Sequence, residues 1–485
     1  METIYDKSQE GKRGTSFTET SLYGGEIEDE LDPDLIRSEG PDLPQVSQPE
    51  LMRHYTRLSK KNYGVDDGLY PLGSCTMKHN PKPMEDIATD PRFRKHHPLV
   101  SDEVVQGNLR LAYELGEYLK SIGGMDGITL QPAAGAHGEL TGMLMIRQFH
   151  AENDGLDQRR EILLPDSSHG TNPASAVVAG FEAVEIKSNE EGTVDLDQLK
   201  EAVGEETAGI MLTVPNTLGI FESDIVEVAE IVHEAGGLCY FDGANLNAFL
   251  GRVRPGDIGM DITHFNLHKT FSTPHGGGGP GSGPVGVKED LIPYLPVPTV
   301  VESDGEYEFD YDRPRSIGKV NSFPGPFGVM VKAYSYIKAL GDAGLRNVSG
   351  KAVLNANYLK EKLKDHYEVA YEGLCKHEFV LSGEDVGKDV KTVDIAKRIL
   401  DYGYHPPTVY FPLIVKEALM VEPTETESKE TLDEFAEAMK EIAREAKEEP
   451  ELLHEAPEST PVGRLDETKA AREPVLRWRG EDAGS

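Results

Sequence analysis

Apolar residues recur along this chain at two spacings, and the change from one to the other falls near residue 128. Before that point, helical spacing predicts an amphipathic helix from about 104 to 122. Its apolar positions are Val104, Leu111, Leu115, Tyr118 and Ile122. After that point, short apolar runs predict buried strands. We expect these strands at 161–164, 183–186, 209–214, 238–241 and 262–267.

Helical patterns lie between several of the predicted strands. The clearest one follows the N-cap candidate Asp224 and ends before the glycine pair at 236–237. Because strands alternate with helices, we expect an α/β fold with a mainly parallel sheet and helices on both faces. Ligands of such sheets bind at the carboxyl ends of the strands.

The pattern changes again after residue 290. A proline-rich stretch is followed by an acidic loop from Glu302 to Asp312. Two helical runs within 329–363 come next, broken near Gly341 and Gly344, and they lead into a smaller C-terminal α/β domain.

The last helix of this smaller domain is well marked. We expect a capping box between Thr431 and Glu434 at its start. Its apolar face consists of Leu432, Phe435, Ala436, Met439, Ile442 and Ala443.

These patterns divide the chain into four parts. Residues 1–50 are polar, acidic and rich in proline, so we expect an extended arm. An N-terminal segment and the large domain occupy 51–330, the small domain occupies 331–455, and an extended tail covers 456–485.

The net charge of the chain excludes some classes of binding partner. Of 485 residues, 49 are Lys or Arg and 85 are Asp or Glu, which gives a formal net charge of −36. This surface repels phosphate backbones and anionic membranes, so neither nucleic acid nor a membrane is expected as a partner. The acidity is spread along the chain, which is typical of a solvated surface adapted to high salt.

The cysteines and the chain start indicate the compartment. Three cysteines, Cys75, Cys239 and Cys375, cannot form a disulfide framework or a four-thiolate zinc site. The first residues show no signal peptide, and no apolar run reaches the roughly 20 residues that span a bilayer. We therefore expect a cytoplasmic globular protein.

The first candidate for chemistry is a small-residue turn over 131–139 that opens a helical run. Free backbone N–H groups and the helix dipole at such a turn suit a phosphate, here beside Gly135, Ala136 and His137. The signal is weak alone, because many turns contain glycine.

The second candidate is Asp242, at the end of the apolar run 238–241 and before two small residues. A carboxylate there points into the ligand crevice of a parallel sheet. An N-cap for the next segment explains the same residue equally well.

The third candidate is Lys269, which directly follows an apolar run and precedes a glycine tract. A desolvated lysine becomes a nucleophilic amine that can form a Schiff base. A solvated lysine is the competing interpretation.

Together the three candidates match the needs of pyridoxal 5'-phosphate. The turn would anchor the phosphate, Asp242 would keep the ring nitrogen protonated, and Lys269 would hold the aldehyde. His137 could stack on the ring. A hydrogen bond within its own loop is the alternative role for that histidine.

Three histidines near Lys269 raise the question of a metal. On the predicted strand, His264 and His268 lie roughly 13 Å apart, too far for one ion. With no thiolate near them or His275 in sequence, we expect no metal site.

Several motifs resemble the glycine decarboxylase P-protein family. In the first half they are Arg53 to Ser59 with Asn62 to Asp66, Tyr70 to Lys78, Pro132 to Glu139, and Pro165 to Ala174. In the second half they are Asn266 to Thr270, Gly403 to Pro412, and Glu422 to Ser428. The family is one long chain in some organisms and two shorter subunits in others. The length and Lys269 imply the second subunit of the split form.

The resemblance implies a type I aminotransferase-like fold and a role in the glycine cleavage system. Glycine would lose CO2, and its aminomethyl group would pass to the lipoyl arm of the H-protein. The implied partner is subunit 1, with two copies of each subunit. The implied catalytic residues are Lys269, Asp242 and His169. The implied cofactor-binding residues are Lys269, Asp242, Ala244, Gly135, Ala136, His137, His268 and Thr270.

One motif departs from the family pattern, because Pro326 in the segment 322–328 stands where asparagine is expected. That loop could reshape the edge of the cofactor site. For Cys75, a small packed thiol is favoured over a place in the site.

Two other functions stay open at this point. Another enzyme of the same cofactor class, such as a serine hydroxymethyltransferase or an amino-acid decarboxylase, can share the lysine motif. A non-catalytic scaffold partner would also keep the fold, although Lys269 and Asp242 are both present.

Overall fold

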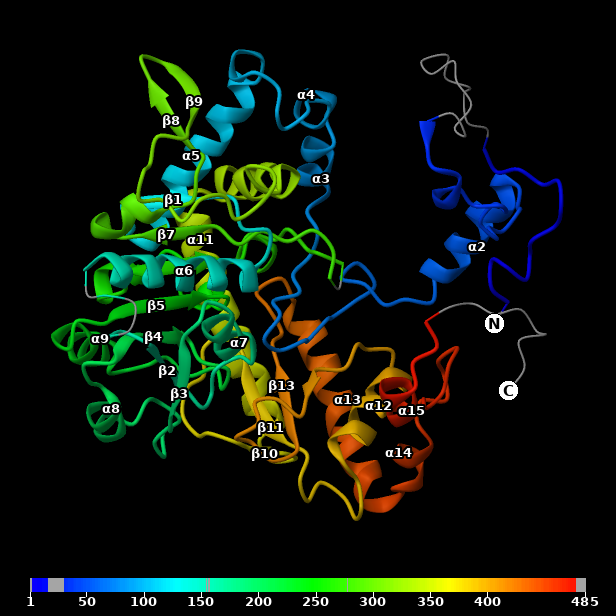
Figure 1. Ribbon diagram of the computed structural model, residues 1–485. Coiled ribbons are helices and arrows are strands. Elements are labelled where there is room, and N and C mark those ends of the chain that lie inside the picture. Colours follow the sequence, from blue (N-terminus) through cyan, green and yellow to red (C-terminus); the bar gives the residue numbers. More distant parts are fainter. Residues whose placement is uncertain (1, 16–29, 154, 156–157, 277, 477–485) are drawn as a thin grey trace. The chain divides into compact units, whose positions relative to one another are not determined.

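The computed structural model describes residues 2–15, 30–153, 155, 158–276 and 278–476, and it divides the chain into two compact units. One unit combines 1–63 with 461–485, and the other is 64–460 (Figure 1). The smaller unit contains η1 (Pro33–Leu35), α2 (Gln48–Ser59) and α15 (Glu467–Arg472). The tail that we expected to be extended therefore includes a six-residue helix.

A seven-stranded sheet forms the centre of the 64–460 unit (Figure 1). Its order is β1-β7-β6-β5-β4-β2-β3, and only β7 runs antiparallel to its neighbours. The strands are β1 (Gly127–Thr129), β2 (Glu161–Pro165), β3 (Glu182–Ile186), β4 (Thr207–Thr213), β5 (Leu238–Gly243), β6 (Ile262–Phe265) and β7 (Val285–Val287). The five predicted strands are thus confirmed as β2 to β6, while β1 and β7 are too short to give a clear pattern.

Successive strand residues point to opposite sides of the sheet, and both sides are buried on the central strands β4, β5 and β6. On β5, Cys239 and Phe241 join a core with α5 (Gln106–Gly123), α9 (Ile225–Glu234) and the start of α11 (Phe327–Leu363). Tyr240 joins the opposite core with α6 (Gly135–Asn153) and α7 (Thr171–Val178). The remaining elements of the large domain are α3 (Lys82–Ala88), α4 (Pro91–Arg94), η2 (Asp102–Val104), α8 (Leu196–Ala202), η3 (Leu246–Ala248), η4 (Pro255–Ile258), α10 (Leu267–Thr270) and η5 (Glu289–Tyr294).

The small domain is built on a second, antiparallel sheet of order β10-β11-β13-β12. Its strands are β10 (Glu368–Val369), β11 (Phe379–Ser382), β12 (Thr408–Val409) and β13 (Ala418–Val421). The second half of α11 packs here with α12 (Thr392–Asp401), α13 (Lys429–Glu448) and α14 (Glu451–Glu455). The helix α11 is interrupted at Gly341, as predicted, and Gly344 stays helical.

Four local predictions need correction. The first concerns the acidic loop, because the segment from Glu302 to Asp312 lies mostly in a hairpin of β8 (Thr299–Ser303) and β9 (Glu306–Asp310). The turn of this hairpin places Asp304 and Gly305 at positive φ, which suits a tight two-residue connection between antiparallel strands.

The other three corrections concern where elements begin and end. The helix predicted from 104 begins at Gln106, and Val104 lies in η2 with 60% of its surface exposed. The strand predicted to reach 267 ends at Phe265, because Leu267 to Thr270 form the helical turn α10. For α13, Ser428 is the N-cap and accepts from the Thr431 N–H, which replaces the predicted Thr431–Glu434 box. The predicted apolar face of α13 is confirmed as buried.

No helix among the described residues is long and apolar enough to cross a membrane.

Candidate active site

A cavity of about 140 Å³ lies at the carboxyl ends of β4, β5 and β6. Three groups of residues line it: the start of α6, the ends of these strands, and loops from elsewhere in the large domain. The lining residues are Ser74, Gly135, Ala136, Glu139, His169, Thr171, Thr213, Thr217, Asp242, Ala244, Asn245, Asn266, His268 and Lys269. All three sequence candidates thus meet in one cavity.

Asp242 is held by residues of β4 and β6 and by the turn after β5. It is only 2% exposed, and its Oδ1 accepts from the Ala244 N–H at 2.9 Å. The Thr213 hydroxyl donates to Oδ2 at 3.2 Å, and His264 Nε2 lies 3.3 Å from Oδ1. The bond to Ala244 fixes the turn after β5. The N-cap of the next segment, η3, is Asn245, so the N-cap role considered for Asp242 is wrong.

A buried chain of side chains stands behind Asp242. Burial lowers the pKa of His264, which keeps its ring neutral, and its Nδ1 lies 2.8 Å from the Tyr240 hydroxyl. Tyr240 itself packs against Gly142 of α6, where an added Cβ would lie 2.2 Å from the tyrosine ring. The helix that carries the phosphate candidate is therefore placed by the same residues that place Asp242.

Lys269 lies in the turn α10, directly after β6. Its Nζ donates to the Ser74 carbonyl at 2.7 Å. Ser74 belongs to the segment from Tyr70 to Lys78, which the sequence marked only as a motif. Nothing in its pattern indicated that its backbone would receive the lysine.

The start of α6 brings backbone N–H groups to the cavity through Gly135 and Ala136. A Cβ at position 135 would lie 2.4 Å from Asn266 Oδ1, so this approach needs a glycine. The first turn of a 19-residue helix favours an anion by its free N–H groups and its dipole.

Of the other predicted site residues, some line the cavity and some do not. His169 and His268 line the cavity, and burial together with Lys269 lowers the pKa of both, that of His268 to about 3. His137 does not line it and lies in the first turn of α6, where its Nδ1 accepts from the N–H of Ala133 in the preceding loop. Thr270 is fully buried behind the site, where its carbonyl accepts from Lys78 Nζ.

Glu139 is the site residue to which the sequence assigned no role. It lies one helical turn into α6, is 4% exposed, and accepts from the hydroxyls of Thr171 and Ser175 at 2.9 and 3.1 Å. Burial and the nearby Asp242 raise its pKa to about 8. At neutral pH the Glu139 side chain is therefore a neutral carboxylic acid next to Asp242.

These residues fit pyridoxal phosphate. The cavity offers an amine, a buried carboxylate and the positive end of a helix, which are the groups needed by its aldehyde, ring nitrogen and phosphate. In addition, Asn266 lines the cavity, and its Oδ1 is buried without a hydrogen-bond partner among the described residues.

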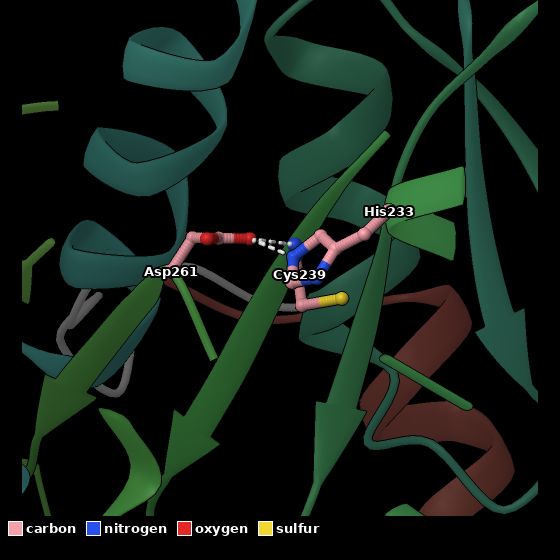
Figure 2. A group of neighbouring side chains, drawn as sticks. All are labelled: His233, Cys239 and Asp261. Carbon is pink, nitrogen blue, oxygen red and sulfur yellow. Dashed lines mark hydrogen bonds and ion pairs between the residues drawn. The ribbon is translucent and has the colours of Figure 1, made fainter. Parts of the chain in front are cut away.

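A second group of ligand-type side chains lies at the opposite, amino ends of β5 and β6. Figure 2 shows the carboxylate of Asp261 directed at the ring of His233, with Cys239 beside them. The Asp261 carboxylate already accepts from His233 Nε2 at 2.8 Å and from the Cys239 N–H at 2.7 Å. These bonds tie the end of α9 to the sheet, so the group has a structural role away from the cavity.

The histidines near Lys269 are also arranged differently from the predicted strand. His264 is on β6, whereas His268 is in α10, with its ring 5.2 Å from that of His275. The separation predicted for two residues of one strand therefore does not hold for His268.

The loop with the unexpected Pro326 lies outside the small cavity. Pro324, Gly325 and Phe327 line a separate cavity of about 450 Å³, together with residues of α5 and β1. Cys75 is half-buried, with its Sγ 3.6 Å from His275 Nε2, and does not line the small cavity.

Comparisons with known proteins agree on one family. Residues 348–458 match the model described as "Glycine dehydrogenase, C-terminal domain", and 142–285 match "Aminotransferase class-V". The chain is 61% identical over 476 residues to the "Probable glycine dehydrogenase (decarboxylating) subunit 2" of Caldanaerobacter subterraneus subsp. tengcongensis, covering 98% of each chain. It is 59% identical to the protein of the same name from Bacillus licheniformis, again over 98% of each.

Solved structures agree on the fold. A glycine decarboxylase (P-protein) of the glycine cleavage system, in inhibitor-bound form, matches with a TM-score of 0.73 and 22% identity, over 86% of this chain and 94% of that one. A glutamate decarboxylase of Lactobacillus brevis matches with a TM-score of 0.65 and 14% identity, over 88% and 98%. The predicted type I fold of pyridoxal phosphate-dependent enzymes is thereby confirmed.

The raised pKa of Glu139 gives a testable pH dependence. A folded-state pKa of about 8, above the ordinary 4.5, stabilises the fold at low pH, and this contribution is lost as the pH rises toward 8. Replacing Glu139 by Gln should remove that loss. In urea unfolding of the cofactor-free chain, the variant should gain stability relative to wild type between pH 5 and 8, by up to about 1.4 kcal/mol per pH unit.

Glu182→Gln, on an exposed residue of β3, is the control. A difference between Glu139→Gln and wild type that stays constant from pH 5 to 8 would show that Glu139 is ionised in the folded chain.

Proposed function

The chain belongs to the glycine dehydrogenase (decarboxylating) subunit 2 family, and from this premise we propose that Lys269 binds pyridoxal phosphate for the decarboxylation of glycine. The aminomethyl group that remains would pass to the lipoyl arm of the H-protein. The observation that carries the proposal is the meeting of Lys269, Asp242 and the start of α6 in one cavity. Family membership also decides against a serine hydroxymethyltransferase or a scaffold protein.

Each part of the cavity has a task in this proposal. The N–H groups at Gly135 and Ala136 orient the phosphate, and Lys269 supplies the amine that holds the aldehyde. Asp242 keeps a proton on the ring nitrogen. When bound, the cofactor supplies an electron-accepting ring for the electron pair that CO2 leaves behind.

His169 and His268, the two histidines that line the cavity, are suited to roles that need an uncharged imidazole. Because burial and Lys269 lower the pKa of His169, its imidazole is uncharged near pH 7 and can accept a proton or stack on the cofactor. Its Nδ1 lies 2.9 Å from the Thr171 hydroxyl, which fixes the ring orientation. His268 is held in the same way by the backbone of Ser282.

The partners belong to the proposal as well. The name of the relatives, subunit 2, supports pairing with a subunit 1, and we propose two copies of each. We also propose a cytoplasmic enzyme with a salt-adapted surface. Three free cysteines and the net charge of −36 support these two points.

Covalent trapping tests the cofactor assignment. Borohydride treatment of the loaded assembly, followed by peptide mapping, should place the label on Lys269. Lys269→Ala should abolish the label and the absorbance band of the bound cofactor, because the variant has no amine at this position. Lys332→Ala, which removes an ion pair with Glu85 outside the cavity, is the folding control and should keep the label. A label on any other lysine would refute the assignment.

Reconstitution tests the need for subunit 1. The chain alone should not exchange labelled CO2 with glycine, and mixing with subunit 1 should restore exchange. Deleting residues 1–45 should weaken assembly about tenfold or more while the 64–460 unit keeps its melting temperature, because the arm belongs to the separate unit. All measurements should use high salt, since self-repulsion at −36 could otherwise dissociate the assembly.

Full exchange by this chain alone, at a concentration where it sediments as a homodimer, would contradict the requirement for a partner.

A further inference from the structure

Two glutamates face each other in the interior of the small domain. The antiparallel pairing of β11 and β13 ends with Phe379 opposite Val421, and Glu378 and Glu422 are the residues next to this last pair. Both are fully buried. Like charges at such positions are destabilising, and a buried carboxylate without compensation is costly. The fold therefore needs something that balances this pair.

A buried histidine completes the cluster. His377 is fully buried, and its Nε2 lies 3.6 Å from Glu378 Oε1. Neither ring nitrogen has a hydrogen-bond partner among the described residues. Ligand-type atoms of His377, Glu378 and Glu422 all lie within 4.8 Å of one another.

The cluster is linked to the catalytic lysine through one residue. Glu378 Oε2 accepts from the Ser74 N–H at 2.7 Å, and the Ser74 carbonyl accepts from Lys269 Nζ, also at 2.7 Å. Ser74 has a φ of +62°, a conformation that a residue with a side chain adopts only when its surroundings hold it. The small domain provides that hold, since Thr408 also donates to the carbonyl of the preceding Gly73.

The charged groups around the pair do not neutralise it. Two cations face it, Lys269 from α10 and Lys78 from the segment that contains Ser74. Lys78 is already paired with the buried Glu425 at 2.7 Å. Lys269 is thus the one remaining cation for two carboxylates in this part of the described chain. Cys75 adds no charge, because burial raises its pKa.

A proton resolves the imbalance. Burial and Glu378 raise the pKa of Glu422 well above its ordinary value, and burial raises that of Glu378 to about 7. Burial lowers the pKa of His377 to about 3, so its ring stays neutral. With a proton on Glu422, the two glutamates carry a single negative charge near Lys269.

We propose that Glu378 is a positioning residue for Lys269. Its Oε2 fixes the Ser74 turn, and the carbonyl of that turn holds the lysine amine in place for the cofactor. In each catalytic cycle the substrate amine displaces Lys269 and the lysine must return, so the Ser74 carbonyl gives it a defined resting place. This inference rests on the proposed function of Lys269.

The test compares two pairs of variants in the full chain, reconstituted with subunit 1 at high salt. Glu378→Leu removes the acceptor for the Ser74 N–H, and Glu378→Gln keeps an oxygen there. Glu222 is the matched control, because it is also buried, accepts one backbone N–H at 3.0 Å and has a pKa raised to about 7. The same two substitutions are made there. The readouts are the rate at which added pyridoxal phosphate becomes borohydride-trapped on Lys269, the pH profile of that rate, and the melting temperature.

We expect Glu378→Leu to slow trapping at least about tenfold, and Glu378→Gln to stay within about threefold of wild type, because the amide oxygen replaces the acceptor. Glu378→Gln should also remove a step near pH 7 from the pH profile of trapping. A purely structural role would not move that profile. Both Glu222 variants should trap at the wild-type rate.

Three results would overturn the proposal. Trapping by Glu378→Leu at the wild-type rate would remove the positioning role, and equal losses at Glu222 would reduce it to general stability. Stoichiometric metal in the wild type, with slower trapping after chelation, would show that a cation and not a proton balances the pair. If Glu378→Leu does not fold, the pH profiles of trapping in Glu378→Gln and Glu422→Gln replace it as the test. A step near pH 7 that is unchanged in both variants would then overturn the proposal. Failure of wild type to trap at Lys269 would instead refute the proposed function.

Discussion

A carboxylate with almost no access to solvent, that of Asp242, sets the positions of its neighbours. Because a buried charge is costly unless it is hydrogen-bonded, the ends of β4, β5 and β6 must bring partners to it. Thr213 and Ala244 donate to it, and His264 Nε2 lies 3.3 Å from its Oδ1. His264 in turn faces Tyr240, whose ring leaves room for α6 only because residue 142 is glycine. The start of α6, where the phosphate would bind, is therefore positioned by the same buried residues that surround the Asp242 carboxylate.

The protonation of buried carboxyl groups near the cavity is a second feature of this interior. Near the cavity, Glu139, Glu378 and Glu422 are all buried and all have raised pKa values. The acidic residues of the surface thus differ from those of the interior in their protonation. Surface carboxylates are solvated and ionised, whereas burial favours the neutral form of each of these three. The interior consequently places few net charges around Asp242 and Lys269.

The sequence was informative where one local rule decided the outcome. The strands β2 to β6 have apolar runs, and Asp242 and Lys269 each follow such a run, so their meeting at the sheet edge could be predicted. It was uninformative where the contact joins distant segments. Ser74 and Glu378 are 304 residues apart, and no periodicity links them. The hairpin β8–β9 was missed for a different reason, because its acidic composition hid the alternation of its strands.

Glycine decarboxylation through Asp242 and Lys269 is tested most directly by CO2 exchange in the Asp242→Asn assembly with subunit 1. The same sample should be assayed for cofactor trapped at Lys269. The amide keeps the shape of the side chain but cannot hold the ring nitrogen protonated, so we predict normal trapping with exchange at least about 100-fold slower. Exchange near the wild-type rate, with the cofactor trapped at Lys269, would contradict this role of Asp242.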